Sequence, residues 1–223
     1  MMTVTLPPFE EVALFHGHVC PGLAFGYRAS EYAKECLNTG RSADEEMVAI
    51  VENDACMIDA IQYITGCTMG KGNLIFRDHG KPVYTFILRN KEKAVRIAQK
   101  PSFSQENVFP ETEEIHARMA AGTATDADRA RMQEIRSAMI EKILSAPLDE
   151  IYECKEVTPE LPERARIFQS VPCAVCGEPV SEQRARVQDG KVVCIPCFNE
   201  YTRAGNNRSP PVFSAILLLM YPP

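Results

Sequence analysis

The sequence has no excess of basic residues. It contains 24 Lys and Arg against 30 Asp and Glu, which gives a formal net charge of -6 and a pI of about 5.4. Phosphate backbones and anionic membranes repel a protein with this charge. The charge balance therefore argues against nucleic acid or a membrane surface as the partner.

Long hydrophobic runs and an export signal are also absent. The longest apolar run, VFSAILLLMY at residues 212–221, is too short to cross a bilayer of about 30 Å as a helix. The start, MMTVTLPPFEE, has neither the basic region nor the apolar segment of a secretion signal. We expect a cytoplasmic protein, with residues 209–223 as a C-terminal tail that docks on a partner subunit.

The cysteines also cannot all be paired in disulfides, because the chain has nine of them. An odd number argues against a closed disulfide framework, and clustered thiols in a reducing compartment more often bind metal or carry out chemistry. The cysteines are therefore the first indication of function.

The length and the pattern of apolar residues predict two domains. The chain has 223 residues, of which 45% are hydrophobic and 24% are charged, enough for one sizeable core and a small module. A mixture of strands and helices over residues 1–165 predicts an α/β or α+β sheet domain. The expected helices are 21–37, 55–66, 91–100 and a helical stretch within 104–147. The expected strands are 47–53, a hairpin of 73–78 with 82–90, and 149–157.

Within the helical stretch, Thr125 precedes a stripe of apolar residues at helical spacing. We interpret this stripe as core or as a subunit interface. Its members are Met132, Ile135, Met139, Ile140, Ile143 and Leu144.

Four cysteines near the C-terminus form the most specific motif. They are arranged as two pairs, each with two residues between its members, and seventeen residues separate the pairs: Cys173, Cys176, Cys194 and Cys197. This spacing is typical of tetrahedral zinc held by four thiolates, which leave no position for substrate. We predict a structural zinc site in a zinc-ribbon or treble-clef-like domain at residues 166–208, whose folding depends on the metal. Residues 173–208 hold five basic and four acidic side chains, a balance that favours a protein partner over nucleic acid.

A second group of metal-binding residue types lies in FHGHVCPG, residues 15–22. In an extended segment His16, His18 and Cys20 share one face, and imidazole with thiolate suits zinc or a related divalent metal. Pro21 then starts a helix with Cys20 at its N-cap, where backbone N–H groups favour the thiolate.

The segment DACMIDAIQYITGCTMGKGN repeats this pattern of residue types. Cys56 lies in the first turn of the expected helix, Asp59 is one turn further on, and Cys67 and Lys71 lie in the following loop. Composition and spacing only slightly favour a joint site, because separate segments need not meet in space. Cys36 and Cys154 are interpreted as packing residues.

Taken together, these motifs resemble FmdE, the family of the E-type subunits of formylmethanofuran dehydrogenase, and they occur in order from about Phe9 to Tyr201. The family is named after a molybdenum or tungsten enzyme that reduces carbon dioxide onto methanofuran, but the name does not establish an activity. The resemblance implies an α+β domain with a mixed sheet flanked by helices, then a four-cysteine zinc module, in a homodimer. It also implies that subunits of a molybdenum or tungsten oxidoreductase are partners.

The resemblance further implies a second divalent metal, with zinc as the first choice, in the N-terminal domain. The expected ligands are His18, Cys56 and Cys67 with a water in the fourth place, and His16 is a further candidate. The residues expected to support the metal or to transfer protons are Cys20, Asp59 and Lys71. Two alternatives stay open: an independent thiol- or zinc-dependent enzyme acting on a small substrate, and a zinc-ribbon regulatory protein.

Overall fold

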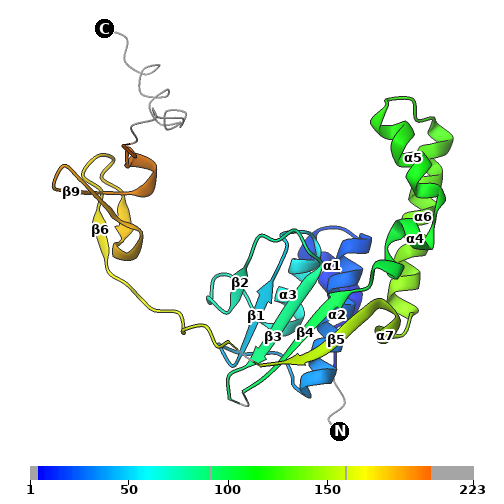
Figure 1. Cartoon of the computed structure of the whole chain (residues 1–223), viewed down its shortest axis with the longest axis horizontal. Coiled ribbons are helices and arrows are strands. Elements are labelled where there is room, and N and C mark those ends of the chain that lie inside the picture. Colours follow the sequence, from blue (N-terminus) through cyan, green and yellow to red (C-terminus); the bar gives the residue numbers. More distant parts are fainter. Residues whose placement is uncertain (1–4, 91, 159, 202–223) are drawn as a thin grey trace. The chain divides into compact units, whose positions relative to one another are not determined.

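The computed structural model describes residues 5–90, 92–158 and 160–201 (Figure 1). Contacts divide the chain into two units, Met1–Ala165 and Arg166–Pro223, and each unit is described by itself. Within the described ranges, no helix combines the length and the apolar character needed to cross a membrane. The expected C-terminal tail, residues 209–223, lies outside the described residues.

A five-stranded mixed sheet is the centre of the first unit. Its order is β2-β1-β3-β4-β5, with β1 parallel to β2 and every other neighbouring pair antiparallel. The strands are β1 (Met47–Val51), β2 (Leu74–Phe76), β3 (Val83–Leu88), β4 (Lys93–Gln99) and β5 (Tyr152–Val157). The predicted α+β class with a mixed sheet and flanking helices is confirmed.

Two secondary-structure predictions for the residues of this sheet are wrong. Residues 73–78 and 82–90 do not form a hairpin, because β2 follows a helical crossover and lies parallel to β1, while β3 pairs with β1 and β4. The predicted helix at 91–100 is also wrong, because Lys93–Gln99 form β4. Val95 and Ile97 face the main core while Ala94 packs on the opposite side of β4. The apolar residues 94, 95, 97 and 98 are separated by three and four positions as in a helical stripe, so their spacing does not distinguish a strand from a helix.

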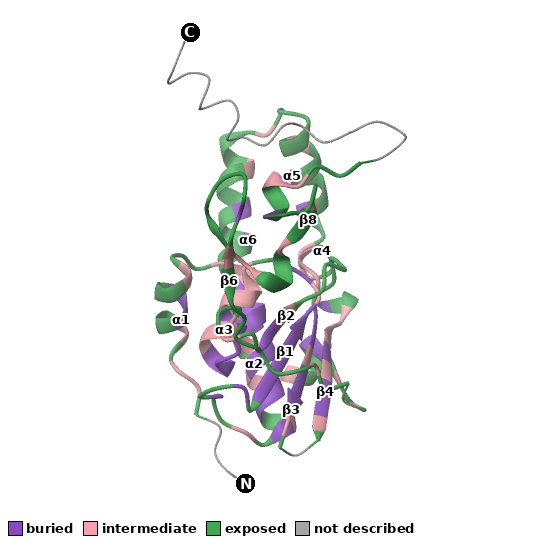
Figure 2. Cartoon of the chain, turned by 90° about the vertical axis from the view of Figure 1, so that its left-hand side faces the viewer, coloured by how far each residue is buried: buried purple, intermediate pink, exposed green. Residues whose placement is uncertain are grey.

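Helices pack on one face of the sheet. The long helix α2 contacts β3, β4 and β5, and α3 packs against α2. Small residues of α2, Ala29 and Ala33, meet Tyr84 and Phe86 in a core that excludes solvent (Figure 2). The helices are α1 (Phe9–His16), α2 (Pro21–Leu37), α3 (Met57–Thr65), α4 (Gln105–Val108), α5 (Glu111–Ala120), α6 (Asp126–Ser145) and α7 (Leu148–Ile151), with a short 3-10 turn η1 (Pro101–Phe103).

The helix α6 begins at a capping box. The Thr125 hydroxyl accepts from the backbone N–H of Asp128, whose carboxylate accepts from the backbone N–H of Thr125. The apolar stripe of α6 is core, as one of the two interpretations predicted. Met139 and Ile143 belong to the sheet core, and Ile140 and Leu144 pack at its margin. Near the other end of α6, Met132 and Ile135 pack with Ile115 of α5, where the two helices extend away from the sheet (Figure 1).

The second unit consists of two small hairpins. β6 (Ser170–Pro172) pairs with β7 (Pro179–Ser181), and β8 (Arg186–Gln188) pairs with β9 (Lys191–Val193). The 3-10 turns η2 (Glu182–Arg184) and η3 (Ile195–Cys197) complete its described elements. Over the described residues 166–201, its buried cluster holds Cys173, Val193 and Cys194, with a few partly buried neighbours. This core is too small to stabilise a fold without a further constraint.

Candidate metal centres

Two glycines let α2 and α3 approach closely. A Cβ atom on Gly26 would lie 2.1 Å from the Met57 carbonyl oxygen, and one on Gly22 would lie 3.2 Å from Cβ of Cys56. Since neither glycine has a Cβ, the N-terminal ends of the two helices lie side by side. Cys20, the N-cap of α2, and Cys56, the N-cap of α3, therefore become neighbours although 36 positions (56 − 20) separate them.

His16 is held in a defined orientation by Asp59. Its Nδ1 lies 2.7 Å from Oδ2 of Asp59, and its side chain is only 10% exposed. A carboxylate partner fixes the proton on Nδ1 and leaves the lone pair on Nε2. That nitrogen lies 4.0 Å from Sγ of Cys20. The lone pair of Nε2 therefore faces the cysteine, where it is free to bind a metal.

Four side chains gather at this point. Donor atoms of His16, His18, Cys20 and Cys56 all lie within 4.8 Å of one another. The first three of these residues do not share a face of an extended segment, as was expected. Instead, His16 ends α1 and Gly17, at φ 95°, turns the chain before His18. Two imidazoles and two thiols form a donor set that fits tetrahedral zinc.

The protonation of Cys20 differs from the expectation for a helix N-terminus. Burial is the largest influence and raises the pKa of its thiol; the Leu23 N–H, which donates to Sγ at 3.3 Å, lowers it, and the neighbouring Cys56 raises it again. Cys20 is the N-cap of α2 as predicted, and the N–H groups there favour its thiolate, but burial and Cys56 outweigh them. A bound divalent cation would supply the missing positive charge.

Cys67 and Lys71 lie outside this group. Cys67 is fully buried in the sheet core, its thiol is 3.5 Å from the Met47 carbonyl oxygen, and burial raises its pKa to about 11. The ammonium of Lys71 donates to the carbonyls of Ala43 and Asp44 at 3.2 and 3.3 Å. The joint placement of these two residues with Cys56 is therefore incorrect: α3 ends at Thr65 with Gly66 as its C-cap, and beyond it Cys67 enters the core while Lys71 bonds to the 42–47 segment.

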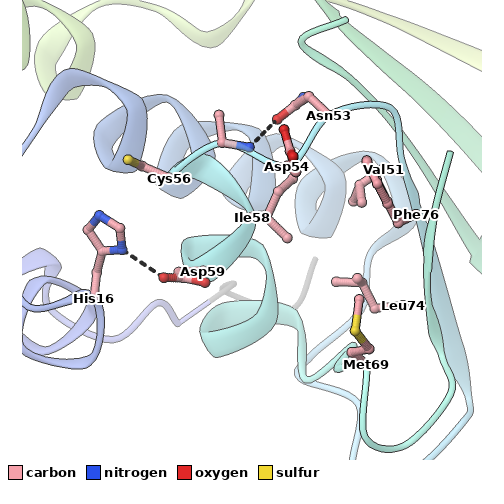
Figure 3. A pocket seen from close by; sticks show the side chains of 11 residues that line it. His16, Val51, Asn53, Asp54, Cys56, Ile58, Asp59, Met69, Leu74 and Phe76 are labelled. Atoms are coloured by element: carbon pink, nitrogen blue, oxygen red, sulfur yellow. Dashed lines mark hydrogen bonds and ion pairs between the residues drawn. The ribbon is translucent and has the colours of Figure 1, made fainter. Parts of the chain in front are cut away.

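A pocket of about 350 Å³ adjoins the donor group (Figure 3). His16, Cys56 and Asp59 form one part of its lining. Its apolar part comes from Val51, Ile58, Met69, Leu74 and Phe76. The sequence analysis missed these apolar residues. Two of them, Val51 and Phe76, end the parallel strands β1 and β2, and ligands of open sheets bind beside the carboxyl ends of the strands. The predicted hairpin of 73–78 with 82–90 concealed this signal.

In the second unit, the four cysteines of the C-terminal motif converge. Their sulfur atoms all lie within 4.8 Å of one another. Gly177, at φ 77°, completes the first turn, where its N–H donates to the Cys173 carbonyl at 2.9 Å. The backbone N–H of Cys194 donates to Sγ of Cys173 at 3.3 Å, which ties the two turns together.

The charges of these sulfurs require a cation. Backbone N–H groups of Cys176, Cys194 and Val175 lower the pKa of Cys173 to about 6, whereas hydrogen bonding with Cys194 raises the pKa of Cys197 to about 12. The backbone therefore favours the thiolate at Cys173, while the neighbouring sulfurs oppose it at Cys197. Zinc offsets the repulsion among four thiolates, so the donor set and the spacing fit a closed structural zinc site.

Comparisons with known proteins agree with both units. Residues 15–153 match the family described as "FmdE, Molybdenum formylmethanofuran dehydrogenase operon", and residues 166–203 match the "Prokaryotic dksA/traR C4-type zinc finger". A protein of Archaeoglobus fulgidus named "Probable S-adenosyl-L-methionine-binding protein" is 34% identical over 193 residues, which are 84% of this chain and 51% of that protein. The chain thus spans about half the length of this curated relative.

A solved structure shares the fold. It is that of a tungsten formylmethanofuran dehydrogenase FmdE-like protein from Syntrophus aciditrophicus, with a TM-score of 0.56 and 22% sequence identity over 88% of this chain and 96% of that one. At this identity the likeness concerns the fold alone. The zinc-finger match and the convergent cysteines support zinc binding in the C-terminal unit. From the match over residues 15–153, the chain belongs to the FmdE family.

Proposed function

We propose that this chain is a metal-binding accessory protein of a molybdenum or tungsten oxidoreductase system, with a second divalent metal, zinc, in its N-terminal domain. The observation that carries the metal site is the group of His16, His18, Cys20 and Cys56, with His16 held by Asp59. Support for the oxidoreductase system comes from the FmdE family and from the name of the solved relative.

The four residues have different roles in this proposal. His16 donates through Nε2, with Asp59 maintaining the tautomer. Cys20 and Cys56 supply sulfur from the start of two helices. His18 is exposed, so it is the ligand that a water or a substrate can displace. A zinc ion with one displaceable ligand supplies Lewis acidity or an activated water.

The proposal predicts two zinc ions per chain. The full-length protein, purified and dialysed without chelator, should contain two by elemental analysis, and a double variant with Cys20→Ser and Cys56→Ser should contain one because it removes both thiolates and leaves two imidazoles. Cys36→Ser is the matched control, since Cys36 lies outside both donor groups, and it should keep two. One zinc in the unsubstituted chain contradicts the N-terminal site.

The association with an oxidoreductase and the homodimer are also proposals. A tagged chain purified from its own host is expected to carry subunits that contain a molybdenum or tungsten cofactor. Light scattering of the isolated chain is expected to give the mass of two copies. A monomer with no associated subunit argues for the alternative of an independent thiol- or zinc-dependent enzyme.

The pocket favours a second candidate function, the binding of a small molecule. Its volume of about 350 Å³ lies in the range of small-molecule sites, which combine apolar walls with a few polar groups. The Archaeoglobus relative is named as a probable S-adenosyl-L-methionine-binding protein. We therefore propose S-adenosyl-L-methionine as the first ligand to be tested in this pocket.

Calorimetric titration of the zinc-loaded chain with S-adenosyl-L-methionine checks this candidate. Phe76 lines the pocket, so Phe76→Ala should weaken binding about tenfold through lost apolar contact. Phe15, which is 56% exposed and packs on Tyr63, does not line the pocket, and Phe15→Ala should bind normally. Absence of any binding, or equal weakening by both variants, contradicts the candidate.

A further inference from the structure

Cys36 and Cys154 form a thiol pair that belongs to neither metal centre. Cys36 lies in the last turn of α2, and Cys154 lies on the edge strand β5. They are 118 positions apart in the sequence, yet their sulfur atoms are 2.8 Å apart. The fold therefore places two sulfurs from distant segments in direct contact.

Neither packing nor metal binding accounts for this contact. Both residues pack at the margin of the sheet core, as the sequence interpretation expected, but both are partly exposed, so small reagents have access. Among the described residues, no third His, Cys, Asp or Glu joins the pair within ligand distance. Two thiols without further ligands do not make a tetrahedral zinc site.

The surroundings favour one thiolate in the pair. A hydrogen bond joins the two sulfurs and either can donate it; it lowers the pKa of the thiol that accepts it, while burial raises the pKa of both. The ammonium of Lys93 donates to the Cys36 carbonyl at 3.0 Å, and its charge favours the thiolate form of both residues. One thiol can therefore ionise and act as a nucleophile while the other keeps its proton.

We propose that Cys36 and Cys154 are a redox modification site that is converted reversibly to a disulfide by a low-molecular-weight disulfide, RSSR. The thiolate of one cysteine attacks one sulfur of RSSR, a new S–S bond forms and RS⁻ leaves. The other cysteine then loses its proton and attacks the protein sulfur of this mixed disulfide, releasing the second RS⁻. Both leaving thiolates take up the protons of the cysteines, so two thiols and RSSR give one protein disulfide and two RSH.

Oxidation has a structural consequence. The bond joins the last turn of α2 to β5, which is otherwise held in the sheet only by β4. A crosslink across 118 positions restricts the unfolded chain and stabilises the folded one. The melting temperature of the oxidised protein should therefore rise by several degrees and return on reduction.

Peptide mapping tests the proposal. The zinc-loaded full-length protein is incubated with glutathione disulfide under native conditions, alkylated, and digested without reductant. We expect a linked peptide containing Cys36 and Cys154 that disappears after dithiothreitol. Cys36→Ser and Cys36→Ala should both lose the linked peptide and the rise in melting temperature, so that a folding defect in one variant does not decide the outcome.

Three results would overturn the proposal. The first is separate alkylation or glutathionylation of the two residues without a linked peptide. The second is a link that forms only in denaturant. The third is a link between Cys20 and Cys56 in its place, since these sulfurs also lie within 4.8 Å of each other. The zinc count is an independent readout, so failure here leaves the metal proposal unaffected.

Discussion

Replacing Cys194 by serine should unfold residues 166–201 while the first unit keeps its structure. Cys194 is one of four converging thiols and also one of the three residues that form the buried cluster within residues 166–201. A structural zinc contributes roughly 10–16 kcal/mol to the folding of such small modules, far more than the apolar contacts among so few side chains. A nitrogen-15 correlation spectrum should show collapsed signals for this unit and dispersed signals for residues 5–158, with one zinc fewer per chain.

Val187→Ser is the matched control in the same unit. Val187 lies on β8 and is 71% exposed, so its loss removes little buried surface and no ligand. This variant should keep its zinc and its spectrum. If Cys194→Ser loses its zinc but retains dispersed signals for residues 166–201, the metal does not hold this unit together.

Local spacing in the sequence was sufficient to predict the C-terminal site. Cys173 with Cys176, and Cys194 with Cys197, each lie within one tight turn, so their geometry is set by neighbouring residues. Only the closure between the two turns is long-range, and the zinc itself enforces it. The prediction therefore did not depend on the rest of the fold.

Tertiary packing, in contrast, decides which residues join the N-terminal group. Cys67 and Cys56 lie at opposite ends of α3, and nothing in the spacing shows that the loop after Gly66 turns into the core. The approach of Cys20 to Cys56 depends on Gly22 and Gly26, whose effect is visible only once α2 and α3 are packed. The contact of Cys36 with Cys154 likewise requires the pairing of β5 with β4.

The same limit explains the error at residues 93–99. The apolar residues of this segment, at 94, 95, 97 and 98, have helical as well as strand spacing, and only the partners β3 and β5 identify it as a strand. Helix α6 was predictable because one face is exposed and its start carries a capping box at Thr125. The strand β1 is buried along its whole length, and its uninterrupted run of five apolar residues was sufficient to predict it.

Asp59→Ala should weaken zinc binding at the N-terminal group by about 10- to 100-fold. Asp59 accepts from Nδ1 of His16 at 2.7 Å, and loss of such a carboxylate partner releases the ring orientation and the tautomer of a ligating histidine. The zinc affinity of Asp59→Asn should lie between those of the unsubstituted chain and Asp59→Ala, because the amide oxygen still accepts the hydrogen bond from His16 but carries no charge. Competition with a chromophoric chelator measures the zinc affinity of the weaker of the two sites in the full-length chain.

Asp54→Ala separates orientation from charge. Asp54 lines the same pocket and carries the same formal charge, whereas the His16 ring nitrogen bonds to Asp59. If the effect of Asp59 were only the local negative potential, the two alanine variants would weaken zinc binding equally. A loss confined to Asp59→Ala, partly restored in Asp59→Asn, identifies the hydrogen bond to His16 as the cause, since only that bond selects the nitrogen that faces Cys20.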